Sequence, residues 1–227
     1  MNKKNKIFQK LKNAIVVSCQ PIEGGPQDNI KTIVSMALAA EIGGCGGLRI
    51  EGAKNIRAVR KVTKLPIIGI IKNDLINYAV RITPLIKDVE RIANSGADII
   101  AYDATNRKRP FSTLSIVNKI QSSNCIAMAD CSNLEDAINA ITEGAEIISS
   151  TLSGYVGKKS NDTDKPDFHL LKEFKKLNSF TMAEGRFNSP DLAKKAIKFG
   201  ADSVTVGSAI TRIENITKWF AKAVKTK

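Results

Sequence analysis

Short apolar runs rich in β-branched residues alternate with amphipathic segments along almost the whole chain. Eight of the apolar runs predict strands, at residues 14–18, 47–50, 67–71, 98–102, 125–129, 146–150, 180–183 and 202–206. The amphipathic segments predict a helix after each strand, at residues 29–42, 53–62, 84–94, 111–121, 134–143, 168–177, 190–199 and 214–224. Such alternation is typical of repeated βα units that build a parallel sheet. Eight units predict an α/β protein that forms one (βα)8 TIM barrel over residues 1–227.

Capping residues mark several of the predicted helix starts. Asp28, Thr83 and Ser189 each precede a helix as candidate N-caps, and Pro84 and Pro190 would each occupy a first helical position. A Gly-Ala pair follows three of the helices, within residues 95–98, 143–146 and 199–202. Glycine after a helix serves as its left-handed C-cap, so the repeat indicates the same supersecondary unit three times. Residues before 13 predict an extra N-terminal helix that covers one end of the barrel.

Two segments allow more than one interpretation. The last helix carries Ile213, Ile216, Trp219, Phe220 and Val224, and we expect this apolar stripe to pack on its own barrel. A contact in a homodimer is the alternative. The polar stretch 157–167 is expected to be a solvated loop rather than a lid over the site.

The net charge of +13 indicates an anionic partner, which could be a nucleic acid or a phosphorylated metabolite. Lysine supplies most of it and is scattered over helix faces and both termini, while aromatic residues make up only 5%. Nucleic-acid readers favour clustered basic segments, arginine forks and interleaved aromatics, so no nucleic-acid partner is expected. The excess positive charge would instead attract a phosphorylated metabolite.

No apolar run reaches the roughly 18 residues of a membrane span, and the basic start of the chain is followed by polar residues rather than an apolar core. We therefore expect a cytoplasmic protein without a membrane partner. Cys19, Cys45, Cys125 and Cys131 make no CxxC pair, and His169 is the one histidine. These spacings offer no metal site, and the thiols are expected to be reduced.

In a (βα)8 barrel, chemistry lies at the carboxyl ends of the strands, and polar residues stand at most of these ends here. Gln20, Lys72, Asp130 and Glu184 follow strands one, three, five and seven. Alternate strands contribute to one layer of side chains, so these four could form the top layer, with Lys72 facing Glu184.

The loops after strands seven and eight predict a phosphate site, because barrels often bind phosphate there with a short extra helix. Glycine would allow a close backbone approach, and free amides near 208–211 would favour an anion. Arg186 and Arg212 would add charge-assisted hydrogen bonds.

Several motifs resemble the N-acetylmannosamine-6-phosphate 2-epimerase family, and they occur in order over residues 7–221. They are Ser18-Cys19-Gln20-Pro21, Gly47-Leu48-Arg49-Ile50-Glu51-Gly52, Gly69-Ile70-Ile71-Lys72, Asp103-Ala104-Thr105, Met128-Ala129-Asp130, Thr151-Leu152-Ser153-Gly154-Tyr155, Ala183-Glu184-Gly185-Arg186 and Val206-Gly207-Ser208-Ala209-Ile210-Thr211-Arg212. One departure is Ile213, where the resemblance leads us to expect proline, and this affects where the last helix begins.

The resemblance implies an isomerase that interconverts N-acetylmannosamine 6-phosphate and N-acetylglucosamine 6-phosphate in sialic-acid and amino-sugar breakdown, without a metal or other cofactor. It implies that Lys72 is the proton-transferring base and Glu184 its partner acid. The residues implied to hold the sugar are Gln20, Arg49, Asp130 and Thr151, and those implied to hold the phosphate are Gly185, Arg186, Gly207, Ser208 and Arg212.

Epimerisation at C2 requires ring opening, removal of the C2 proton and its return to the other face. Burial or Arg49 would lower the pKa of Lys72, whereas Glu184 and phosphate would raise it. The sequence leaves one-base and two-base mechanisms open.

Three other functions can be weighed. A lysine after strand three also suits Schiff-base aldolase chemistry on another phosphosugar. A metal-dependent pentose-phosphate epimerase is disfavoured by the single histidine. A non-catalytic basic binding protein would bind nucleic acid in a salt-sensitive way.

Overall fold

A computed structural model describes residues 2–156 and 165–225. Eight parallel strands pair in sequence order and close into a barrel, in which β8 pairs with β1. The strands are β1 (Ala14–Ser18), β2 (Gly47–Glu51), β3 (Ile67–Ile70), β4 (Ile99–Asp103), β5 (Ile126–Asp130), β6 (Ile147–Ser149), β7 (Phe180–Glu184) and β8 (Ser203–Val206). The predicted (βα)8 barrel is confirmed.

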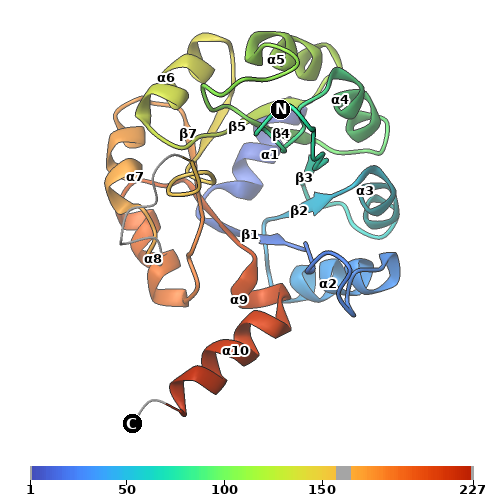
Figure 1. Cartoon of the computed structure of the whole chain (residues 1–227), viewed down its shortest axis with the longest axis vertical. Coiled ribbons are helices and arrows are strands. Elements are labelled where there is room, and N and C mark those ends of the chain that lie inside the picture. Colours follow the sequence, from blue (N-terminus) through green and yellow to red (C-terminus); the bar gives the residue numbers. More distant parts are fainter. Residues whose placement is uncertain (1, 157–164, 226–227) are drawn as a thin grey trace.

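Helices surround the barrel, as Figure 1 shows for the ring from α2 to α8. They are α1 (Lys3–Leu11), α2 (Ile30–Ile42), α3 (Ala53–Arg60), α4 (Ile86–Ala93), α5 (Thr113–Ser122), α6 (Leu134–Thr142), α7 (Phe168–Lys175), α8 (Pro190–Lys198), α9 (Ser208–Thr211) and α10 (Ile213–Ala223). The short helix expected near 208–211 is present as α9.

Strand alternation sends one set of side chains into the barrel and the other set toward the helices. Val16, Ile68, Ile99 and Met128 belong to a buried cluster inside the barrel. The alternate residues of the same strands form larger clusters beneath the helices. This parity decides which residues at the strand ends can reach the site.

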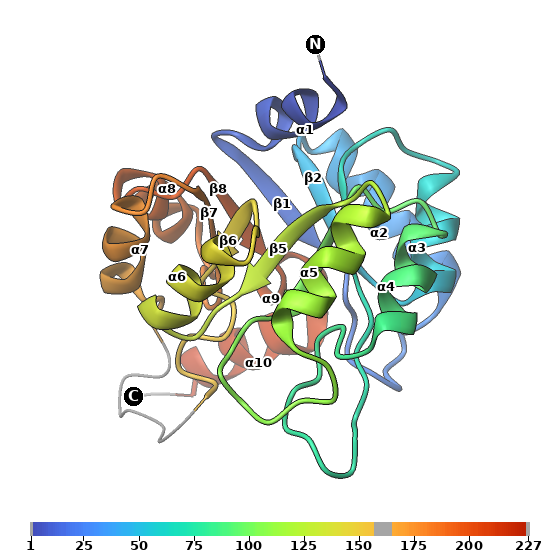
Figure 2. The same ribbon diagram turned by 90° about the horizontal axis from the view of Figure 1, so that it is seen from above.

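Helix α1 closes the amino-terminal end of the barrel, as predicted. Its Ile7 and Leu11 are buried and join the cluster inside the barrel. Figure 2 shows α1 over one end of the strands, with α9 and α10 near the other end. The barrel is therefore packed from below, and its polar end is the one formed by the carboxyl ends of the strands.

Some of the predicted helix caps are confirmed. Gly96, Gly144 and Gly200 have φ angles of +92°, +102° and +109°, which confirms left-handed conformations after three helices. Ser189 caps α8 by accepting a hydrogen bond from the Leu192 amide.

Two predicted caps are wrong. Asn29, not Asp28, caps α2, because the Asn29 side chain accepts a hydrogen bond from the Thr32 amide. Helix α4 starts at Ile86, after residues 83 and 84. Thr83 has φ +46° and donates its hydroxyl to the Ala101 carbonyl, so it ties the loop to β4 and cannot act as the cap.

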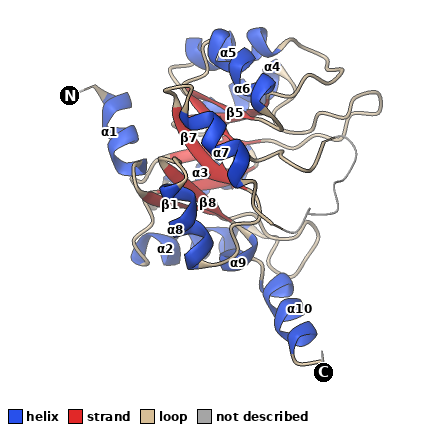
Figure 3. Ribbon diagram, turned by 90° about the vertical axis from the view of Figure 1, so that its left-hand side faces the viewer, coloured by secondary structure: helices blue, strands red, loops and turns tan. Residues whose placement is uncertain are grey.

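The prediction that the last helix packs on its own barrel is wrong. No described residue of α10 is buried, and the helix projects away from the ring beyond α9 (Figures 1 and 3). Helix α10 begins at Ile213 and follows α9 directly, so the turn at Arg212 directs it outward. Among the described residues, no helix is both long enough and apolar enough to cross a membrane. The predicted loop at 157–167 lies mostly outside the described residues.

Candidate active site

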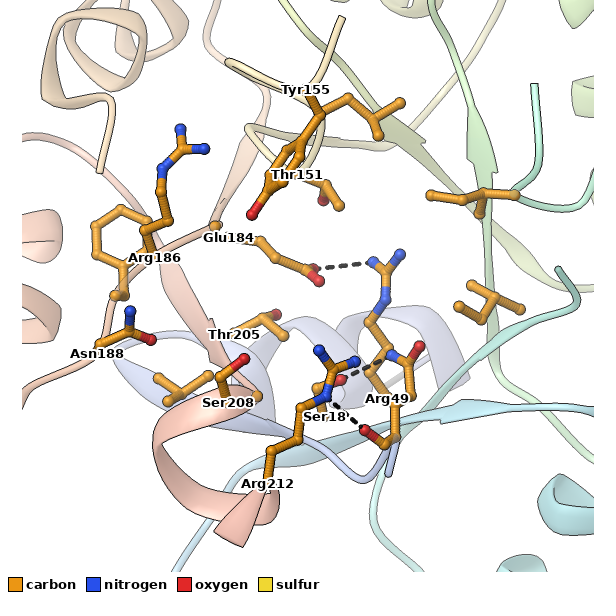
Figure 4. Close-up of a pocket in the computed structure, with 18 of the residues that line it drawn as sticks. Ser18, Arg49, Thr151, Tyr155, Glu184, Arg186, Asn188, Thr205, Ser208 and Arg212 are labelled. Atoms are coloured by element: carbon orange, nitrogen blue, oxygen red, sulfur yellow. Dashed lines mark hydrogen bonds and ion pairs between the residues drawn. The ribbon is translucent and has the colours of Figure 1, made fainter. Parts of the chain in front are cut away.

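A cavity of about 330 Å³ opens at the carboxyl ends of the strands, the end predicted to carry the site. Figure 4 shows its walls, with side chains from β1, β2, β7, β8 and the loops that follow β6, β7 and β8. Nearly all of the residues predicted for the site line it: Gln20, Arg49, Lys72, Thr151, Glu184, Gly185, Arg186, Gly207, Ser208 and Arg212.

Arg49 crosses the barrel and holds two carboxylates. Its Nη1 and Nη2 atoms lie 3.2 Å and 2.6 Å from the two oxygens of Asp130, and Nη1 also lies 2.9 Å from Glu184 Oε2. The guanidinium is buried, and it reaches from β2 across the barrel to residues of β5 and β7, the two neighbours of the opposite strand β6. A bidentate contact of this kind fixes the plane of the guanidinium and the direction of both acids.

Asp130 does not line the cavity, although the resemblance implies that it holds the sugar. It is fully buried below the floor, and both of its oxygens accept hydrogen bonds from Arg49. Thr151 Oγ1 donates to Asp130 Oδ1 at 2.7 Å while lining the cavity itself. Asp130 therefore orients Arg49 and Thr151 from beneath.

Of the four residues expected to form a layer from alternate strands, Gln20, Lys72 and Glu184 line the cavity, whereas Asp130 lies below it. Glu184 forms its ion pair with Arg49, which comes from β2, one of the strands that the expected layer excluded. The side chain of an arginine is long enough to span a barrel interior, and this removes the restriction to alternate strands. Lys72 lines the same cavity, and its charge acts on Glu184.

Burial raises the pKa of Glu184 to about 7, even though the neighbouring Arg49 favours the charged form. Asp130, a second acid in the same buried cluster, adds to the rise. A carboxyl group with a pKa near neutrality can both accept and release a proton at physiological pH.

Lys72 follows β3 and is held in place by a backbone bridge to Ile82. Burial lowers the pKa of its amine, Glu51 opposes that change, and Arg49 adds to it. Lys72 and Glu51 also line a second cavity of about 360 Å³ that adjoins the first at Lys72, Gln20 and Arg212. A lowered amine pKa increases the fraction of neutral lysine, which is the form that acts as a base.

The loop after β7 places backbone next to the cavity. Gly185 has φ +107°, a conformation that glycine adopts without strain, and Arg186 follows at φ +63°. The Arg186 guanidinium donates to the carbonyls of Ser153 and Lys165 and lies 5.0 Å from the centre of the Tyr155 ring. Figure 4 shows this side chain directed toward Tyr155, so Arg186 also organises the loop after β6.

The loop after β8 is attached to β1. Thr211 Oγ1 donates to the Ser18 carbonyl at 2.7 Å, and Arg212 Nε donates to the Gln20 carbonyl at 2.9 Å. A Cβ atom at Gly207 would lie 3.3 Å from Ser18 Cβ, so glycine allows the close approach of the two strands. These contacts hold Ser208 and Arg212 at the cavity (Figure 4).

Sequence reasoning assigned no site role to several cavity residues, among them Ser18, Thr205, Tyr155 and Asn188. Ser18 and Thr205 share inward parity with Val16 and Ser203, so strict alternation along β1 and β8 could have found them. Tyr155 and Asn188 lie in loops, where no periodicity applies. Within the described part of the chain, no group of three or more His, Cys, Asp or Glu side chains could hold a metal ion.

The closed barrel and the acid and base groups at its carboxyl end define the class: an enzyme on a (βα)8 barrel. Residues 33–226 match the family model described as "Putative N-acetylmannosamine-6-phosphate epimerase". The chain belongs to this family.

Relatives and a solved structure agree over nearly the full length. A protein of Haemophilus influenzae is 49% identical over 97% of this chain and 96% of its own. One of Vibrio cholerae is 51% identical over 95% of this chain and 89% of its own. Both are named "Putative N-acetylmannosamine-6-phosphate 2-epimerase". The solved N-acetylmannosamine-6-phosphate 2-epimerase of Clostridium perfringens is similar with a TM-score of 0.92 and 38% identity, over 95% of both chains.

Proposed function

We propose that this protein interconverts N-acetylmannosamine 6-phosphate and N-acetylglucosamine 6-phosphate by moving the C2 proton, in the breakdown of sialic acid and amino sugars. The observation that supports this most directly is the cavity itself, which Lys72 and Glu184 both line. The strands that carry them, β3 and β7, stand opposite each other in the eight-stranded barrel.

Opposite placement suits a reaction in which one face of the sugar loses a proton and the other face gains one. After ring opening exposes the C1 aldehyde, neutral Lys72 takes the C2 proton, and the electron pair moves onto the carbonyl oxygen to give an enolate. Glu184 in its protonated form then gives a proton to the other face of C2. The reverse reaction exchanges the two roles, so the pair always carries one transferable proton.

Arg49 stabilises the enolate oxygen in this proposal, because its buried guanidinium is already held in place before substrate arrives. Gln20 and Thr151 hold the sugar from the cavity wall. Asp130 acts through Arg49 and Thr151, since its own oxygens are occupied.

The phosphate is proposed to bind at the loops after β7 and β8. The residues assigned to it are Gly185, Arg186, Gly207, Ser208 and Arg212, all of which line the cavity. Glycine allows backbone amides to approach the anion, and the Ser208 hydroxyl and Arg212 add donors. The net charge of +13 favours the arrival of such a substrate.

An assay in heavy water tests the reaction. We expect N-acetylglucosamine 6-phosphate formed from N-acetylmannosamine 6-phosphate to carry deuterium at C2, as read by NMR, because solvent exchanges with the acid that reprotonates C2. Lys72→Ala and Glu184→Gln are each expected to lower kcat by at least about a hundredfold, the usual contribution of an acid–base group. The matched control is Lys12→Ala, an exposed lysine at the opposite end of the barrel.

Product without solvent deuterium would contradict the proposed transfer of a second, solvent-exchanging proton from Glu184. A covalent adduct of Lys72 that borohydride traps with the phosphosugar would instead support Schiff-base chemistry. Full activity in either variant would remove that residue from the mechanism.

We also propose a homodimer and a cytoplasmic location. Helix α10 exposes Ile213, Trp219 and Phe220 on a segment that contacts little of its own barrel. A second copy of the chain would cover this surface if each α10 packed against the other molecule. The four cysteines are free and buried, which suits a reducing compartment.

A further inference from the structure

Two buried polar atoms at the cavity have no hydrogen-bond partner among the described residues. They are Arg49 Nε and Thr205 Oγ1, on residues that are 1% and 2% exposed. Native proteins pair nearly all buried polar groups, so each unpaired atom at a cavity indicates a partner that arrives from outside the chain.

Thr205 differs from the other buried threonines in the described part of the chain. Thr83, Thr181 and Thr211 donate their hydroxyls to backbone carbonyls, Thr63 Oγ1 accepts a hydrogen bond from the Leu65 amide, and the Thr105 hydroxyl donates to Asp103. Only the Thr205 hydroxyl lacks such a contact, and Thr205 is also the only one of these six residues that lines the cavity.

The position of Thr205 indicates which part of a ligand it would meet. In the sheet, Thr205 on β8 pairs in register with Glu184 on β7, so the two inward-facing residues are neighbours. Ser208 follows three residues later at the loop proposed to hold phosphate. Figure 4 shows Thr205 between Glu184 and Ser208 on the same wall.

We propose that the Thr205 hydroxyl forms a hydrogen bond with an oxygen of the bound phosphosugar. This oxygen is attached to one of the carbons that lie between the reacting C2 and the phosphate. The assignment rests on the proposed epimerase function, because Glu184 defines the reacting end and Ser208 the phosphate end. Thr205 is thus a substrate-binding residue that sets the distance of C2 from Glu184 once the phosphate is held.

Three variants separate this role from a structural one. Thr205→Val keeps the shape and removes the hydroxyl, Thr205→Ser keeps the hydroxyl, and Thr181→Val makes the same change on β7 on the face turned away from the cavity. The measurements are the Kd for N-acetylglucosamine 6-phosphate by calorimetry, kcat/KM for epimerisation, and Tm without ligand.

We expect Thr205→Val to weaken phosphosugar binding and lower kcat/KM by about tenfold, the effect of one lost hydrogen bond. The same variant should keep or raise Tm, because it removes an unpaired buried hydroxyl. Thr205→Ser should retain binding while lowering Tm through its missing methyl group. Thr181→Val should lower Tm and leave binding unchanged.

The proposed contact therefore predicts that Thr205→Val and Thr205→Ser rank in one order by phosphosugar affinity and in the opposite order by Tm. Unchanged binding in Thr205→Val, or a binding loss that follows the loss of Tm across the variants, would overturn it. A phosphosugar analogue that lacks the contacted hydroxyl should bind wild type and Thr205→Val equally, which provides a second measurement. If the wild type binds the phosphosugar without epimerising it, the proposed function fails while the Kd comparison still decides the role of Thr205.

Discussion

At the scale of single residues, Arg49 determines how the site is organised. One buried guanidinium holds Asp130 by two contacts and Glu184 by a third, so the two acids cannot turn independently. Glu184 nevertheless keeps a pKa of about 7, because burial and the neighbouring Asp130 disfavour its charged form. The result is an acid that is fixed in direction and still titrates near neutrality.

This pKa predicts a bell-shaped dependence of kcat/KM on pH. The active pair carries one proton shared between Lys72 and Glu184. Below about pH 7 both groups are protonated, so activity should rise as pH increases through that value. Activity should fall again where Lys72 loses its proton, at a pH below the ordinary 10.5 because burial lowers the pKa of this amine.

Initial rates in both directions between pH 5 and 10 measure the profile. Titration of the substrate phosphate, with a pKa of about 6, gives the reference curve against which the acidic limb is compared. A profile that stays flat from pH 6 to 8 would show that Glu184 does not gain or lose a proton in the rate-determining part of the reaction.

At the scale of secondary-structure elements, α1 contributes to stability from the end of the barrel opposite the site. Its Leu11 is 0% exposed and packs into the cluster inside the barrel. We expect Leu11→Ala to lower the free energy of unfolding by about 2–5 kcal/mol, as large-to-small core changes do. Urea unfolding measures the loss, with the exposed Gln9→Ala on the same helix as the control.

The same variant should leave KM and kcat unchanged at temperatures where it remains folded, because the cavity lies at the other end of the strands. A loss below about 1 kcal/mol would mean that α1 covers the barrel without supporting it.

The sequence predicted the order of the elements well because hydrophobic periodicity and the Gly-Ala pairs are local signals. The eight strands, α1 and α9 are where the pattern places them. The start of α4 could not be predicted in the same way, because the Thr83 hydroxyl donates a hydrogen bond to the carbonyl of Ala101 on β4. Contacts with residues distant in the sequence override local capping preferences.

The candidate site likewise contains residues that could be predicted from the sequence and residues that could not. Glu184 and Lys72 could be placed at the cavity from topology and family resemblance, and the structure brings both to it. The burial of Asp130 beneath Arg49 could not be predicted, because it depends on how far a long side chain reaches across the barrel. Thr205 gave no sequence signal beyond its parity, since an unpaired hydroxyl is recognised only in three dimensions.

At the scale of the whole molecule, α10 is the element that the barrel does not explain. Phe220 is 70% exposed on it, and Ile213 at its start is 59% exposed. Burying this face of α10 against a second copy would stabilise the assembly by about 25 cal/mol per Å² of apolar surface removed from water. This exposed surface is the reason that a homodimer is proposed.

We expect sedimentation equilibrium to give twice the chain mass of 24.6 kDa for the wild type. Phe220→Asp should shift the protein to the single-chain mass, since a charge would be buried at the contact. Ile76→Asp changes an equally apolar but fully exposed residue in the loop after β3 and should leave the mass unchanged. A monomeric wild type would contradict the proposed assembly.

The closure of the barrel by α1 determines where a tag, surface linker or fusion partner can be attached. The chain starts at the sealed end, whereas α10 and the last described residues lie toward the open end (Figure 3). A tag, surface linker or fusion partner joined before Lys3 would leave the entrance of the cavity and the face of α10 clear. The same addition after Ala223 would extend the helix that is proposed to meet the second copy, and would interfere with that assembly first.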